Sequence, residues 1–69
     1  MNTYEVMAYQ FAGLFWTKLS EMKDDIEDMG FEVEDINNEY VLVTDGDFEY
    51  QMYLGCANCT RWITQIVRV

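Results

Sequence analysis

The sequence contains no proline, no histidine and only four basic residues, and each absence excludes a class of protein. Without histidine the usual general base is missing, and the four glycines lie too far apart to form a phosphate-binding loop. No apolar run approaches the roughly 20 residues that span a bilayer. The first residues include Glu5 and lack the basic segment of a signal peptide. We therefore expect a cytoplasmic protein that is not an enzyme and needs no cofactor.

Acidic residues are abundant instead. Thirteen Asp and Glu against four Lys and Arg give a formal net charge of −9. Nucleic acid and anionic membranes would repel this chain, whereas basic proteins would attract it. The content of apolar residues, 51%, is too high for a disordered acidic tail. We predict one folded domain, residues 1–69, that contacts neither nucleic acid nor membrane directly.

The hydrophobic pattern changes its period at Gly30. Before it, apolar residues recur every three or four positions, which predicts one helix from Tyr4 to Met29. After it, alternation predicts strands at residues 31–34, 40–44, 48–54 and 61–69. We expect a two-residue type I′ turn at Asp45-Gly46 and a longer loop at residues 55–60. The predicted fold is α+β, with one N-terminal helix packed on a four-stranded antiparallel β-meander.

The aromatic residues divide into expected core and expected surface. Those assigned to the core are Phe11, Phe15, Phe31, Phe48 and Tyr50. Tyr53 falls on the polar side of its strand, where an exposed aromatic could anchor a partner. Leu14 and Trp16 flank the helical stripe and could reach a second surface. The facing of the last strand stays open, because Trp62 and Ile66 compete with Ile63 and Val67.

The acidic residues are concentrated in one stretch. All but Glu5 lie between Glu21 and Glu49, where Lys23 is the only cation. Several occupy the end of the predicted helix, where each costs roughly 0.3–1 kcal/mol against the helix dipole. An arrangement that opposes folding is typical of a functional surface. The predicted partner-binding residues are Glu21, Asp24, Asp25, Asp28, Glu32, Glu34, Asp45, Asp47, Glu49 and Tyr53.

Two motifs suggest metal or redox chemistry, and neither is complete. Asp45, Asp47 and Glu49 have the spacing of the first ligands of a calcium loop, but the glycine and glutamate that should follow are absent. Cys56 and Cys59 match half of a zinc site. The alternatives for this pair are two small apolar residues near a turn, a zinc ion shared between chains, or a redox pair. We expect no metal.

In length, in charge and in the acidic stretch from Glu21 to Glu49, the chain resembles small acidic phage-encoded inhibitors, which include anti-CRISPR proteins and other DNA mimics. The resemblance implies action in the cytoplasm of an infected bacterial cell, and we expect a monomer or homodimer. It also implies a partner with a basic nucleic-acid channel, such as a CRISPR effector complex or another host DNA-binding complex. Two alternatives remain: a regulatory protein–protein interaction module, which could be a homodimer, and a CxxC metal or redox protein.

Overall fold

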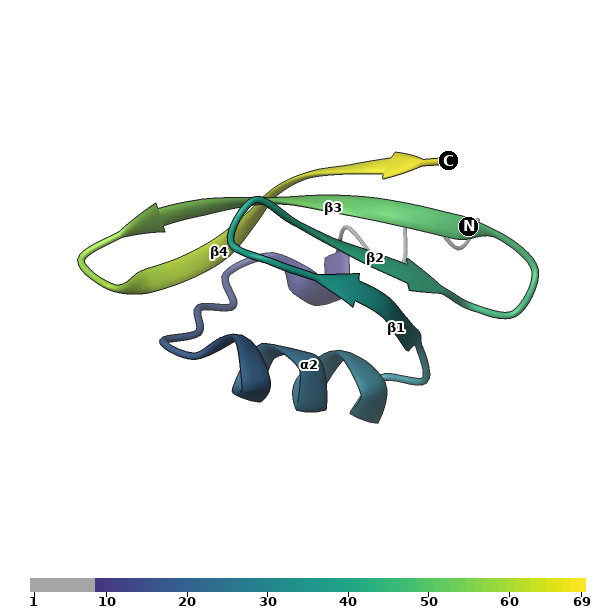
Figure 1. Ribbon diagram of the computed structural model, residues 1–69, viewed down its shortest axis with the longest axis horizontal. Helices are drawn as coiled ribbons and strands as arrows, with labels where there is room; N and C mark the ends of the chain where they lie inside the picture. Colours follow the sequence, from purple (N-terminus) through teal and green to yellow (C-terminus); the bar gives the residue numbers. More distant parts are fainter. Residues whose placement is uncertain (1–8) are drawn as a thin grey trace.

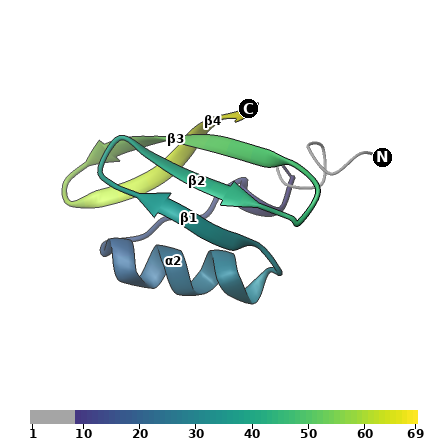
Figure 2. The same ribbon diagram turned by 45° about the vertical axis from the view of Figure 1, so that its right-hand side comes forward.

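The computed structural model describes residues 9–69 and shows a mixed α+β fold (Figure 1). Four antiparallel strands form one sheet in the order β1-β2-β3-β4, so the predicted meander is confirmed. Helix α2 packs against β1 and lies along one face of the sheet (Figure 2). The elements are α2, Leu19–Asp28; β1, Glu32–Ile36; β2, Tyr40–Thr44; β3, Glu49–Ala57; and β4, Thr60–Arg68.

The prediction of one continuous helix from Tyr4 to Met29 is wrong within the described residues. Residues 9–11 are helical, but residues 12–18 are not, and α2 begins only at Leu19. Gly13 has a φ of 77°, which is incompatible with a right-handed helix. Trp16 then pairs with Arg61 of β4 through two backbone hydrogen bonds of 2.9 and 2.7 Å. This pairing replaces the helical hydrogen bonds. The predicted start at Tyr4 lies outside the described residues.

Two turns also differ from expectation. The β2–β3 connection spans residues 45–48, so the predicted two-residue turn at Asp45-Gly46 is wrong. Only Gly46 has a positive φ there, whereas a type I′ turn needs two such residues. The two-residue turn occurs between β3 and β4, where Asn58 and Cys59 have φ values of 52° and 63°. The longer loop predicted over residues 55–60 is therefore replaced by strand and turn.

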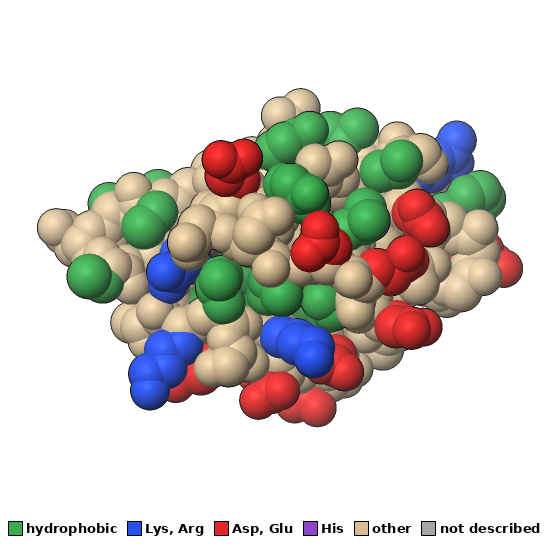
Figure 3. Space-filling view, in the orientation of Figure 1, with side chains coloured by type: hydrophobic (Ala, Val, Ile, Leu, Met, Phe, Trp, Pro, Cys, Tyr) green, Lys and Arg blue, Asp and Glu red, His purple; other side chains and the backbone are tan. Residues whose placement is uncertain are grey.

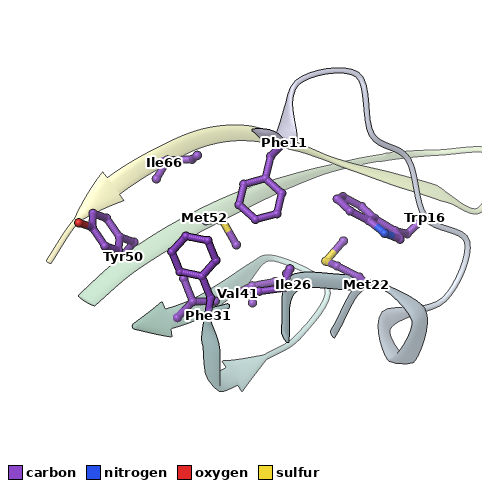
Figure 4. Close-up of a cluster of buried hydrophobic side chains, with 10 residues drawn as sticks. Phe11, Trp16, Met22, Ile26, Phe31, Val41, Tyr50, Met52 and Ile66 are labelled. Atoms are coloured by element: carbon purple, nitrogen blue, oxygen red, sulfur yellow. The ribbon is translucent and has the colours of Figure 1, made fainter. Parts of the chain in front are cut away.

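The core fills the space between α2 and one face of the sheet, the inner face (Figure 4). Phe11, Phe31 and Tyr50 are buried as predicted, but Phe15 and Phe48 are 63% and 48% exposed, so their assignment to the core is wrong. Trp16, expected at the flank, is buried instead. The complete core is Phe11, Trp16, Met22, Ile26, Phe31, Val41, Val43, Tyr50, Met52 and Ile66.

A β-bulge resolves the facing of β4. Met52 pairs with Ile66, and Leu54 pairs with Ile63, so the register shifts by one residue between these pairs. Ile63 and Ile66 therefore both pack toward the core, although they are three residues apart. Simple alternation could not assign both residues to one face. Trp62 and Val67 lie on the opposite side of the strand as a result.

Candidate functional site

The first group of predicted residues lies on α2. Glu21, Asp24 and Asp28 are exposed, while Met22 and Ile26 on the same helix are buried. The last turn of α2 contains no basic residue, so its acids are not balanced there. The single ion pair among the described residues joins Lys23 Nζ to Glu27 Oε1 at 3.8 Å. We call Glu21, Asp24 and Asp28 the helix acids.

Asp25 differs from the helix acids because its carboxylate accepts a hydrogen bond within the fold. The indole Nε1–H of Trp16 donates a hydrogen bond of 2.7 Å to Asp25 Oδ2. Trp16 is only 5% exposed, and its N–H can act only as a donor. Asp25 therefore fixes the segment before α2 to the helix, and part of its role is structural.

Asp45 and Asp47 lie in the β2–β3 loop. Asp45 Oδ1 accepts hydrogen bonds of 2.9 Å from the backbone N–H groups of Asp47 and Phe48. These bonds favour the ionised carboxylate and lower the pKa of Asp45 below its ordinary value. The side chain of Asp45 thus closes the loop, as Asp commonly does in turns. Asp47 is exposed beside it.

The second acidic group lies on the sheet. Glu32 pairs with Thr44, and Thr44 pairs with Glu49, so both glutamates lie in one row across three strands. Glu34 occupies the bulge in β1, between Val33 and Asp35. Loss of hydration, followed by repulsion from Glu49 and then Glu32, raises the pKa of Glu34. We call Glu32, Glu34 and Glu49 the sheet acids.

Tyr53 is 39% exposed, as predicted, and it lies on the same side of β3 as Glu49. Sequence reasoning missed the other exposed apolar residues that share this side of the sheet. Phe15 contacts Trp62 edge to face, with ring centroids 6.2 Å apart, and Val67 is 39% exposed. The bulge in β4 and the break in the helix concealed them, because both interrupt the period from which facing was predicted.

The structure places these groups on two sides of the sheet. Acidic side chains follow the edge of the molecule where α2 lies and also occur among hydrophobic side chains over the sheet (Figure 3). The two acidic groups lie on different sides of the sheet: α2 covers the inner face, and Glu32 and Glu49 point to the opposite face. Of the ten predicted residues, Asp25 and Asp45 are engaged within the fold, and the others leave their carboxylates or ring available to a partner.

Cys56 and Cys59 flank the β3–β4 turn, and both are exposed free thiols. Among residues 9–69, no group of three or more His, Cys, Asp or Glu side chains is placed to hold a metal ion. The pair lies in a strand and a turn, and not at the helix N-terminus where redox cysteines commonly occur.

No helix in the described part of the chain is long and apolar enough to cross a membrane. Comparison with protein-family models, with curated proteins and with solved structures found no match.

Proposed function

We propose that this protein binds, without catalysis, to the cationic surface of a nucleic-acid-binding protein and blocks access of the nucleic acid. The observation that supports the proposal is that the helix acids on α2 and the sheet acids on the opposite face of the sheet are all exposed. Within the described residues, none of these six carboxylates forms an ion pair. Their charge is therefore available to an external partner.

The spacing of the acids suits the replacement of phosphates. Asp24 and Asp28 are separated by one helical turn, with Cβ atoms about 5–6 Å apart, and the sheet acids extend the charge onto a rigid sheet. A channel that binds phosphates through Lys and Arg would attract such an array at long range. The bacterial cytoplasm, where such channels operate, is the proposed place of action.

The interaction should be collective and sensitive to salt. An exposed ion pair contributes only about 0–1 kcal/mol, so no single carboxylate should decide binding. Screening becomes strong beyond a Debye length of roughly 10 Å at 0.1 M salt. Binding should therefore form quickly at low salt and weaken as salt rises.

The test is competition with nucleic acid. A CRISPR effector complex is the first target because of the resemblance described above, and proteins retained from a bacterial lysate at low salt are the next. We expect the protein to prevent the target from binding duplex DNA, and duplex DNA to displace the protein in return.

Two charge-reversed variants identify the mechanism. The helix-acid variant is Glu21→Lys/Asp24→Lys/Asp28→Lys. The sheet-acid variant is Glu32→Lys/Glu34→Lys/Glu49→Lys. Asp25 and Asp45 are left unchanged because their carboxylates accept hydrogen bonds within the fold. At least one variant should lose competition, because like charge within a cationic channel is costly. Undiminished competition by both would refute the acidic mechanism.

A further inference from the structure

The sheet face turned away from α2, the outer face, has an ordered composition. Val41 and Val43 of β2 and Tyr50 and Met52 of β3 are buried, so the residues between them point to the outer face. Reading the register across the strands gives three rows: Glu32, Thr44, Glu49 and Val69; Asp35, Leu42, Gln51 and Val67; and Tyr40, Tyr53 and Gln65. Trp62 and Phe15 extend the face beyond the third row.

The outer face is therefore acidic in its first row and mixed beyond it, where Leu42, Val67, Tyr40 and Tyr53 lie beside Asp35, Gln51 and Gln65. Phe15, Tyr53 and Val67 expose 63%, 39% and 39% of their surfaces, and Val69 exposes 69%. Single exposed apolar residues are ordinary, but a contiguous apolar group rimmed by charge is typical of a protein-binding surface. Among the described residues, no helix covers this side of the sheet (Figure 2).

The arginines of the sheet do not balance the acidic end. Arg61 donates to the Thr17 carbonyl at 2.7 Å and to Asn38 Oδ1 at 3.2 and 3.3 Å. Arg68 stacks over the ring of Phe48, 4.8 Å from its centroid. The sheet acids remain without a cationic partner in the described part of the chain. These exposed acids are therefore free to meet the cations of a partner.

We propose that the outer face is the docking surface for a basic protein segment that also carries apolar side chains. This inference rests on the proposed function and specifies its partner. The cations of the segment meet the sheet acids, and its apolar side chains cover Leu42, Tyr53 and Val67. A second copy of the chain fits poorly, because it would place the same acids and a formal charge of −9 against this face. Nucleic acid and anionic membranes are disfavoured by the same charge.

Two peptides of equal charge separate this surface from general acidity. One alternates lysine with leucine, and the other separates its lysines with serine. Backbone amide shifts of the whole protein, measured by NMR during titration, locate each peptide. We expect the leucine peptide to shift the amides of Gln51, Tyr53 and Val67, and the serine peptide to shift only residues near acidic groups.

Two variants provide matched controls. Tyr53→Thr/Val67→Thr should weaken binding of the leucine peptide about tenfold by removing its apolar anchors and leave the serine peptide unaffected. Both positions are exposed and threonine suits strands, so the fold should be retained. The helix-acid variant described above should bind the leucine peptide nearly as well as the parent does.

Several results would overturn the inference. The leucine peptide could shift only the amide signals of α2. Duplex DNA or anionic vesicles could shift the amide signals of the outer face. The protein could also sediment as a dimer that Tyr53→Thr/Val67→Thr dissociates. The helix-acid variant alone could lose competition with DNA, while the sheet-acid variant and Tyr53→Thr/Val67→Thr compete normally. This inference would then fail and the proposed function would stand. If all variants competed normally, both would fail.

Discussion

The bond between Trp16 and Asp25 allows the structural and functional acids of α2 to be separated experimentally. Replacing Asp25 with alanine removes the acceptor of the 2.7 Å hydrogen bond from Trp16 Nε1. An unsatisfied buried donor costs about 1–3 kcal/mol, and Trp16 is 5% exposed. We therefore expect Asp25→Ala to destabilise the protein, although the same change removes a charge from an unfavourable position.

The opposing contributions can be compared. Removing an acid from the last turn of a helix returns about 0.3–1 kcal/mol, and removing the like-charge pair with Glu21 returns about 0.2–0.5 kcal/mol. The lost hydrogen bond should exceed these gains, which leaves a net destabilisation of about 1 kcal/mol. For a domain of this size the melting temperature should fall by about 4–8 °C.

Asp28 provides the matched control. It lies in the same last turn, and its carboxylate accepts no hydrogen bond from the described residues. Asp28→Ala should leave the melting temperature unchanged or raise it, because it relieves the dipole conflict and the like-charge pair with Asp24 and removes no hydrogen bond. Asp25→Asn should fall between the parent and Asp25→Ala, since its amide oxygen can still accept from the indole.

Thermal and urea unfolding, followed by circular dichroism, measure these differences. A double-mutant cycle with Trp16→Phe isolates the pair, because each single change removes the hydrogen bond by a different route. The reasoning is refuted if Asp25→Ala is as stable as Asp28→Ala, or if the cycle shows no coupling between Trp16 and Asp25.

Three further predictions concern the sheet. The pKa of Glu34 is raised, so the folded protein keeps this proton at a pH where the unfolded chain has released it. Ionised Glu34 therefore lowers the free energy of unfolding at neutral pH. This destabilisation disappears as the pH falls through the raised pKa. Glu34→Gln should therefore be more stable than the parent at neutral pH, by a margin that shrinks on acidification; a constant margin across a urea-unfolding pH series would contradict this. Gly55→Ala should destabilise by about 1–3 kcal/mol, because its Cβ would lie 2.7 Å from Trp62 Cε2, and an unchanged melting temperature would disprove the clash. Cys56→Ser/Cys59→Ser should leave melting temperature, sedimentation and competition with DNA unchanged, since the thiols are free and exposed; stoichiometric zinc in the purified parent would reverse this expectation.

The sheet was predictable because its signals are local. β2 matches its predicted bounds, Tyr40–Thr44, since its buried residues alternate without interruption. Gly30, with a φ of 95°, ends the helical segment as predicted. The order of the strands followed from short connections between antiparallel neighbours.

The failures arose where a distant contact overrides local periodicity. The spacing of Phe11, Phe15 and Leu19 fits a helix, but the pairing of Trp16 with Arg61 joins segments 45 residues apart in the chain and leaves Phe15 on the outer face. No pattern within the first thirty residues could reveal a partner in β4. The aromatic end of the candidate surface was missed for the same reason, while Tyr53 was found because it obeys the period of its own strand.

Protection of a sheet edge is an alternative reason for acids on a strand, and it accounts for only some of those seen here. β1 is an edge strand, and its charges and bulge would discourage pairing with other chains. Glu49, however, lies on β3, an interior strand, and the helix acids lie on no strand. The opposite edge strand, β4, carries charge of the other sign, from Arg61 and Arg68. An arrangement selected only for edge protection would spare the interior strand and the end of α2. Edge protection therefore does not account for Glu49 or the helix acids, and partner binding is our proposal for them.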